Sequence, residues 1–274
     1  MPEALMERVN EEKMEAWLRD SLDEPKTTLD ITRFSYLTDY IKNNFKPEEG
    51  HKKVLDVGCG CGHFVRALKQ EGYEAKGIDH NSEIIGLAAQ KHGLDLSAGN
   101  ILALPYQDGA FDMAICFEVL EHVQNYPGVI EEIKRVLKKD GVLLITVPNF
   151  YCYDCIEGAT GIISGTIRLI NKTRKAFKLG EIYKDGYSTH LHKRFPTKWL
   201  KSFRESGLEL LDQRPILISF YIPENFKPLV KAESFLAGTK PIKKFQTFLT
   251  DFLAKIPLLK YSGQTHLFVF RIKG

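Results

Sequence analysis

Apolar residues in the middle of the chain follow two periods, one typical of buried strands and one typical of helices. Compact apolar runs predict strands near 53–57, 75–79, 94–98, 111–117 and 141–147. Helical spacing predicts helices near 63–71, 81–91 and 127–138, and Gly72, Gly93 and Gly141 stand where glycine commonly ends a helix. Strands and helices that alternate in this way predict a parallel sheet with right-handed crossovers.

The two ends of the chain add further elements to this core. Residues 1–46 contain two amphipathic helical stretches, punctuated by Pro25 and Pro47. A helix over 196–205 precedes a sixth strand, and the closing GQTHLFVFRIKG alternates as a seventh strand does. An insert at about 222–262 separates these two strands. Its apolar residues recur at helical spacing, namely Ile242, Phe245, Leu249, Phe252 and Ile256, joined by Phe248 and Leu253.

The segment VLDVGCGCGHFVRALKQEG, residues 54–72, predicts a strand, a turn with three glycines and a helix. Gly58, Gly60 and Gly62 let the backbone turn sharply and approach a ligand without Cβ atoms in the way. The segment differs from the dinucleotide fingerprint GxGxxG, because its third glycine comes one residue early and His63 follows it. Asp56 lies in the strand itself, where a carboxylate suits a cationic ligand better than a pyrophosphate.

Polar residues also stand at the ends of the neighbouring strands. Asp79 ends the second strand, where an acid can hold a ribose diol by two hydrogen bonds. Asn100 and the pair Phe117–Glu118 follow the third and fourth strands. Ligands in open parallel sheets bind at these strand ends, so we expect Asp79 to face the glycine turn and complete one cofactor site.

In this order, four segments resemble the class I S-adenosylmethionine-dependent methyltransferases: LDVGCGCG, GIDHNSEII, GNILALPYQDGAFDMAICFEVLEHV and EIKRVLKKDGVLLITVPN. The resemblance implies an α/β fold with a Rossmann-like, doubly wound, seven-stranded sheet, parallel except for an antiparallel last strand. It implies a single methyltransferase domain with a helical N-terminal cap (1–46) and a cofactor-binding core (47–150). A basic insert (151–195) and the C-terminal part of the sheet (196–274), which holds the helical insert 222–262, would follow.

The same resemblance implies S-adenosylmethionine as cofactor and S-adenosylhomocysteine as product. Asp79 would bind the ribose hydroxyls, and Gly58 and Gly60 would let the backbone pass the methionine portion. Asp56 would favour the sulfonium or amino end, and Asn100 would accept from the adenine amino group. Further cofactor contacts are implied for His80, Ile101 and Phe117. A bare tight turn for the glycines and a helix cap for Asp79 are the structural alternatives.

The catalytic base has three candidates, His122, His190 and His192, because a neutral histidine titrates near ambient pH. His122 has a structural alternative, since the EHV sequence is common in the family among enzymes with different substrates. Glu118, Glu121 and His122 also resemble the Glu-x-x-Glu-His cluster of metal-binding quinone O-methyltransferases. Cys152 and Cys155 form a CxxC whose spacing to His190 and His192 matches no familiar zinc module, so we expect no metal there.

The acceptor is narrowed mainly by a missing motif. The fourth strand lacks the Asn/Asp-Pro-Pro-Tyr/Phe of base-amine methyltransferases, and no RNA-binding module is visible, so we expect no nucleic-acid partner. A small-molecule or lipid-linked acceptor methylated on oxygen is the leading hypothesis, with Arg33, Phe34 and Tyr36 as pocket residues by family analogy. The alternatives are a non-catalytic S-adenosylmethionine-binding partner subunit and a nicotinamide-dependent oxidoreductase.

Charge and cysteine content add the remaining expectations for this 274-residue chain. Residues 1–150 carry 17 lysines and arginines against 25 acids, whereas residues 151–274 carry 21 against 10. This asymmetry suggests an anionic surface or substrate near the C-terminal half. The insert 222–262 is interpreted as a lid over the acceptor site, with a homodimer interface or a peripheral membrane contact as alternatives. Five cysteines, an acidic start and no apolar run of ~20 residues favour the cytoplasm.

Overall fold

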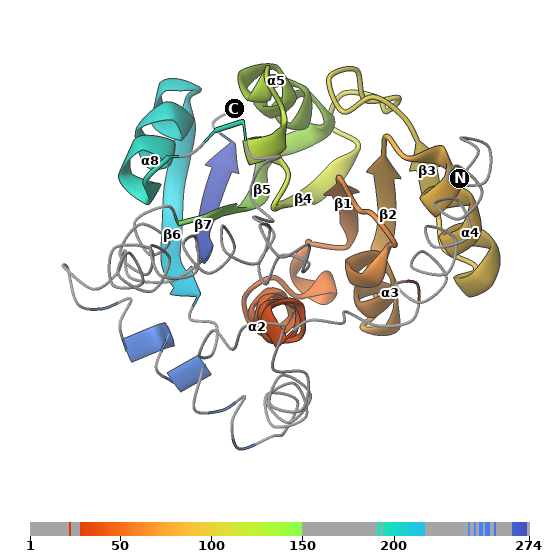
Figure 1. The fold of residues 1–274 in the computed structure, drawn as a ribbon, viewed down its shortest axis with the longest axis horizontal. Coiled ribbons are helices and arrows are strands. Elements are labelled where there is room, and N and C mark those ends of the chain that lie inside the picture. Colours follow the sequence, from red (N-terminus) through yellow and green to blue (C-terminus); the bar gives the residue numbers. More distant parts are fainter. Residues whose placement is uncertain are drawn as a thin grey trace, which may run out of the picture.

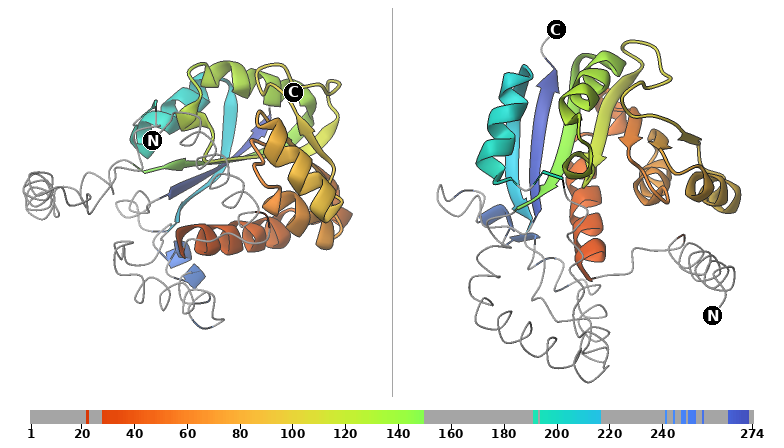
Figure 2. Two further views of the ribbon diagram at one scale, coloured as in Figure 1. Left: turned by 45° about the vertical axis from the view of Figure 1, so that its right-hand side comes forward. Right: turned by 45° about the horizontal axis from the view of Figure 1, so that its top comes forward.

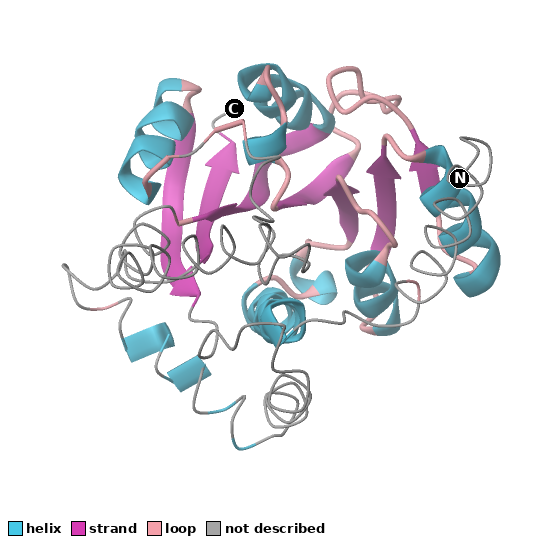
Figure 3. Ribbon diagram, viewed as in Figure 1, coloured by secondary structure: helices cyan, strands magenta, loops and turns pink. Residues whose placement is uncertain are grey.

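The computed structural model places the predicted core elements in one α/β layer arrangement (Figures 1 and 3). It describes residues 28–149, 191–192, 194–216 and 265–272, with Leu22 and single positions at 241, 244, 247–248, 250–252 and 255. The strands are β1 (Lys53–Val57), β2 (Glu74–Asp79), β3 (Leu96–Ala98), β4 (Phe111–Phe117), β5 (Leu137–Pro148), β6 (Leu208–Ile216) and β7 (Thr265–Ile272). The helices are α2 (Thr28–Asn44), α3 (His63–Gln70), α4 (Ser82–His92), α5 (Tyr126–Val136) and α8 (Pro196–Glu205), with short 3-10 turns η1 (Pro47–Glu49) and η2 (Leu120–His122).

The seven strands form one mixed sheet in the order β3-β2-β1-β4-β5-β7-β6. Strands β1 to β5 pair in parallel, whereas β7 is antiparallel to both of its neighbours, β5 and β6. The predicted doubly wound, seven-stranded sheet with an antiparallel last strand is thereby confirmed. Because β1 pairs with β2 on one side and β4 on the other, the strand order reverses at β1, where ligands bind in such sheets.

Two hydrophobic clusters cover the two faces of the sheet, and Figure 2 shows α5 and α8 on one side with α2 on the other. On the first face α5 and α8 contribute fully buried residues such as Ile133, Trp199 and Phe203. On the second face α2 and α3 contribute Leu37, Ile41 and Leu68, all with no exposed surface. The amphipathic stretch around 34–45 thus forms a helix that packs directly against the sheet.

Gly141 is an exception to the sequence-based expectations. Helix α5 ends at Val136 and β5 begins at Leu137, so Gly141 lies inside a strand and does not end a helix. A Cβ atom at Gly141 would lie 2.7 Å from the carbonyl oxygen of Lys138, next to a register shift between β4 and β5. The glycine is therefore required for close backbone approach at this irregularity.

Candidate functional site

The glycine turn between β1 and α3 is the first part of the site. Gly58, Gly60 and Gly62 have φ values of 79°, 49° and 72°, in the left-handed region that side chains disfavour. The amides of Gly58 and Cys59 donate to the Ile78 carbonyl at 2.8 and 3.1 Å, which ties the turn to β2. A Cβ atom on Gly60 would meet nothing within 4 Å, so open space adjoins the turn at this residue.

Asp79, at the end of β2, points at this turn. Its Oδ2 accepts the Gly60 amide at 3.0 Å, and its Oδ1 accepts the Asn81 amide at 3.0 Å. Asn81 caps α4 through its own side chain, which accepts from the amides of Glu83 and Ile84. A carboxylate has about four lone-pair positions, so two backbone donors leave positions for ligand hydroxyls. His80 lies beside Asp79 with its side chain 92% exposed and its Nδ1 3.1 Å from Oδ1.

Asp56 lies within β1 and is 3% exposed. Burial, together with the charge of Asp79, raises the pKa of the Asp56 carboxyl to about 8. A carboxylate at the end of β2 beside an open glycine turn suits a ligand that carries ribose hydroxyls, and a cation near Asp56 would favour its ionised form. This arrangement fits a sulfonium nucleoside such as S-adenosylmethionine.

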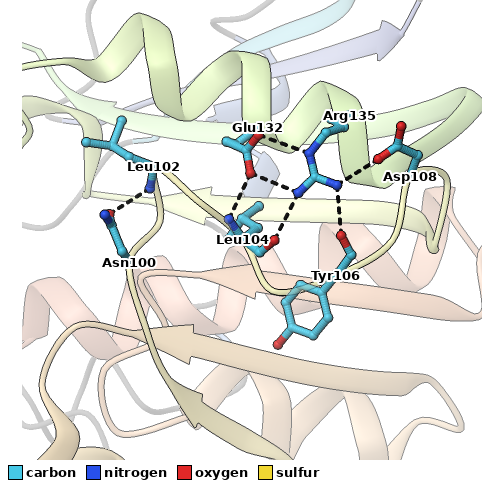
Figure 4. Close-up of polar contacts among 7 residues, drawn as sticks. All are labelled: Asn100, Leu102, Leu104, Tyr106, Asp108, Glu132 and Arg135. Atoms are coloured by element: carbon cyan, nitrogen blue, oxygen red, sulfur yellow. Dashed lines mark hydrogen bonds and ion pairs between the residues drawn. The ribbon is translucent and has the colours of Figure 1, made fainter.

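Asn100 begins a loop that α5 holds in place (Figure 4). Its Oδ1 accepts the Leu102 amide at 2.9 Å, so part of its acceptor capacity is used within its own turn. Glu132 accepts the Leu104 amide at 2.8 Å, and Arg135 donates to the carbonyls of Leu104 and Tyr106 at 2.9 and 2.8 Å. Arg135 also donates to Asp108 at 2.8 Å. Sequence analysis missed Glu132 and Arg135, and their i,i+3 spacing in EEIKRVL is the only local signal for them.

The end of β4 carries a second group of side chains. Glu118 has a φ of 56°, and its Oε2 lies 2.8 Å from the Arg33 Nη1 of α2. The ring of Phe64 lies between those of Phe34 and Phe117, with centroids 4.8 and 4.9 Å away. Arg33 and Phe34 of α2 therefore contact residues at the end of β4 and the start of α3, and their role in an acceptor pocket stays a prediction.

Tyr36 takes a different position. It is 7% exposed within the second hydrophobic cluster, and its hydroxyl donates to Asp251 at 3.4 Å. The structure thus separates Tyr36 from Arg33 and Phe34. The Tyr36 hydroxyl thus contacts the insert between β6 and β7, and its pocket role stays a prediction.

The histidines suggested by the sequence differ in their surroundings. His192 has its Nε2 3.0 Å from the Val123 carbonyl, and its ring packs edge-on against Tyr126. His122 has its side chain 40% exposed, and its Nε2 lies 3.8 Å from Glu121 Oε1. His190 lies outside the described residues, although the amide of its neighbour Leu191 donates to the Glu121 carbonyl at 2.8 Å.

Glu121 is the most deeply buried acid of this region, at 1% exposure, and neither of its carboxylate oxygens has a hydrogen-bond partner. Burial and the charge of Glu118 raise the pKa of Glu121 above its usual range. Within the described ranges, no group of three or more His, Cys, Asp or Glu residues is arranged to hold a metal ion. Cys152 and Cys155 lie outside those ranges.

Comparison with known proteins agrees with this geometry. A family model described as a methyltransferase domain matches residues 29–232. The chain is 33% identical over 148 residues to ubiquinone biosynthesis O-methyltransferase of Haemophilus ducreyi, which is 48% of this chain and 58% of that protein. It is 36% identical over 107 residues to norajmaline N-methyltransferase of Rauvolfia serpentina, 36% of this chain and 37% of that protein. The chain thus spans about half the length of these curated relatives.

Solved structures show the same fold at lower identity. A Thermotoga maritima S-adenosylmethionine-dependent methyltransferase has a TM-score of 0.53 at 15% identity, covering 89% of this chain and 92% of its own. The [4+2]-cyclase SpnF has a TM-score of 0.52 at 23% identity, covering 86% and 80%. Since the family model spans most of the chain and the sheet has the fold of these neighbours, the chain belongs to the methyltransferase domain family, whose cofactor is S-adenosylmethionine.

Proposed function

We propose that this protein is an S-adenosylmethionine-dependent methyltransferase that methylates an oxygen atom of a small-molecule or lipid-linked acceptor. One observation carries the proposal: the Asp79 carboxylate accepts the amide of Gly60 at the open glycine turn, beside the buried Asp56. The name of the Haemophilus ducreyi relative supports oxygen as the methylated atom. The name of the Rauvolfia serpentina relative makes nitrogen the second candidate.

The bound cofactor supplies an electrophilic methyl group, and the residues of this chain bind and orient it. Asp79 would hold the ribose hydroxyls through the lone pairs that its two backbone donors leave unused. Gly60 would leave room for the methionine portion, Gly58 allows the turn to pack closely against Val119, and Asp56 would favour the positive charge of the cofactor. Asn100 retains a second lone pair on Oδ1 for the adenine amino group. His80, Ile101 and Phe117 would make further contacts with the cofactor.

His122 is the proposed general base for a hydroxyl acceptor. It lies in η2, the short turn that follows β4, and its side chain is 40% exposed. The Nε2 of His192 already bonds the Val123 carbonyl, which favours an anchoring role for that residue. His190 is the second candidate, because its neighbour Leu191 is bonded to the carbonyl of Glu121.

The acceptor side supports an apolar substrate. The rings of Phe34, Phe64 and Phe117 are each only partly buried and lie in contact at the strand ends. The ion pair of Arg33 and Glu118 is the polar group beside them.

We propose that the whole chain acts as one methyltransferase domain in the cytoplasm, a compartment consistent with the free thiols of Cys59, Cys61 and Cys116.

Calorimetric titration with S-adenosylmethionine and S-adenosylhomocysteine tests the cofactor assignment. The wild type should bind both, and Asp79→Ala should weaken binding by roughly 1–3 kcal/mol, because the ribose loses a charged acceptor. Asp95→Ala is the matched control, because it also removes an acid, one whose carboxylate pairs with Lys76 Nζ at a distance of 2.9 Å. Absence of binding by the wild type would refute the proposed function.

A panel of acceptors tests the methylated atom. Phenols, carboxylates, amines, glycans and prenylated or acylated compounds are incubated with the protein and S-adenosylmethionine, and the products are analysed by mass spectrometry. Transfer to a phenol or carboxylate supports the oxygen assignment, whereas transfer confined to amines contradicts it. His122→Ala should lower kcat on a hydroxyl acceptor by about 10²–10⁴, without a change in cofactor affinity.

A further inference from the structure

The insert between β6 and β7 is attached to the body of the protein on one side. Its described positions at 241, 244, 247–248 and 250–252 are helical. Thr250 is 1% exposed, and Asp251 Oδ1 accepts Arg214 Nη1 of β6 at 2.5 Å. In Figure 1 these pieces lie at the end of the sheet where β6 finishes. This side of the helix therefore faces β6.

Two phenylalanines lie on the outer side of the same helix. Phe248 and Phe252 are 64% and 50% exposed, and their rings stack with centroids 6.2 Å apart and planes 17° apart. They are four residues apart, so they share one face of a helix. In the described part of the chain they are the large aromatic side chains that are exposed. The sequence pattern placed Phe252 on an apolar stripe, and the structure shows that this position points substantially to solvent.

Lysines flank this aromatic pair. Lys244 precedes Phe248 by four residues, Lys255 follows Phe252 by three, and both are exposed. The sequence adds Lys240 and Lys243, and the only acid in 240–256 is Asp251, which Arg214 binds. An exposed aromatic pair with cationic flanks matches the amphipathic helices that lie in the interface of anionic membranes.

We propose that the surface formed by Phe248 and Phe252 of this helix, with Lys244 before them and Lys255 in the turn after them, docks on an anionic lipid surface, with the two rings inserted among the headgroups. A second copy of the chain fits this face poorly. In a two-fold contact the lysines of both copies would approach each other, and like charges there are unfavourable. Two phenyl rings also provide far less area than a stable dimer interface, which buries about 1,200–2,000 Å².

Vesicle co-sedimentation tests this proposal, using phosphatidylcholine vesicles with and without phosphatidylglycerol. The wild type should sediment with the phosphatidylglycerol vesicles, less so with phosphatidylcholine alone, and less at raised ionic strength. The double variant Phe248→Ser/Phe252→Ser should lower the partition coefficient by about tenfold or more, because the inserted apolar surface is lost. The readout is independent of enzyme activity, so it holds whether or not the proposed function is correct.

Matched control variants distinguish binding through this surface from non-specific binding of the protein to vesicles. Leu211→Ser removes an apolar side chain that is 40% exposed on β6, and should leave binding unchanged. Lys244→Gln/Lys255→Gln should weaken binding to anionic vesicles, whereas Lys201→Gln on α8 should not. All variants change exposed side chains, so their thermal unfolding should match the wild type.

Three results would overturn the proposal. The first is that the wild type binds neither kind of vesicle, and the second is that the double serine variant binds as well as the wild type. The third is a wild-type dimer in light scattering that dissociates in the double serine variant without any vesicle binding. That last result would assign the face to a second copy of the chain.

Discussion

A single buried carboxyl, Asp56, links the electrostatics of the site to its ligand. Its pKa is raised to about 8 because burial and the charge of Asp79 both disfavour its ionised form. In the free protein Asp56 is therefore largely protonated at neutral pH. A cation bound beside Asp56 would stabilise the ionised carboxylate, so that binding releases a proton. The number of protons released then reports whether the ligand is positively charged.

We expect the affinity for S-adenosylmethionine to rise as pH increases toward about 8 and then to level off, because binding the sulfonium ionises Asp56. S-adenosylhomocysteine lacks the sulfonium charge, so its affinity should change less over the same range. Calorimetry in buffers of different ionisation enthalpy measures the released proton directly. In Asp56→Asn the proton release should disappear and the affinity for S-adenosylmethionine should fall severalfold.

The same carboxyl affects stability with a definite sign. Its folded-state pKa is raised above the ordinary value of 3.8, so the folded state binds more protons than the unfolded state between pH 3.8 and about 8. The free energy of unfolding should decrease as pH rises through this window, and less so in Asp56→Asn. Denaturant titrations of the ligand-free proteins measure this difference, and equal slopes in both proteins would contradict the assignment.

At the scale of elements, the glycine turn combines two separate constraints. A side chain on Gly58 would overlap Val119, whereas one on Gly60 would enter open space. Gly58 is thus required for packing of the turn against the loop after β4. Gly60 has no packing requirement, and the space beside it is where the proposed cofactor passes.

Gly60→Ala should therefore fold but lose cofactor binding, with an unfolding penalty of about 1–2 kcal/mol from the left-handed backbone. Gly72→Ala is a close control, because Gly72 has a φ of 89° and equally open surroundings away from the turn. It should lose similar stability and keep its affinity for S-adenosylhomocysteine. Comparable affinities of the two variants would place the ligand elsewhere.

At the scale of the whole molecule, a polar network joins three parts that are distant in sequence. Tyr40 of α2 donates to Asp212 Oδ2 at 2.7 Å, and Arg214 Nε donates to the same oxygen at 2.8 Å. Arg214 also binds Asp251 of the insert, to which Tyr36 donates. The N-terminal end of α2 is connected in turn to β4 through Arg33 and Glu118. Helix α2, the edge strand β6 and the insert are thereby held together.

Asp251→Ala should detach the insert without unfolding the sheet. The Asp251 side chain is 43% exposed, so solvent screens the ion pair and the loss of stability should be about 1 kcal/mol or less. Hydrogen exchange should increase in residues 241–255 and stay unchanged in β4 and β5. Glu205→Gln, which removes an exposed acid 3.8 Å from Lys201 on α8, is the control that should leave exchange in the insert unchanged.

The sequence by itself determined the sheet, the order of its helices and the approach of Asp79 to the glycine turn. Strand and helix periods are local properties, so β1 to β4 and the helices α3, α4, α5 and α8 were predicted close to their observed bounds, whereas β5 begins four residues before its predicted start at 141. Asp79 could be placed against the glycine turn because parallel strands bring their carboxyl ends to one edge. Gly141 was misassigned because its role depends on the carbonyl of Lys138, which spacing does not reveal.

Only the tertiary structure decided the contacts between residues far apart in the chain. Arg33 with Glu118, Arg214 with Asp251, and Arg135 with the Asn100 loop each join separate elements whose approach is set by packing of the whole core. The raised pKa of Asp56 and the outward direction of Phe248 and Phe252 depend in the same way on what surrounds them. Burial and side-chain direction arise when elements pack together, so no local pattern of residues contains them.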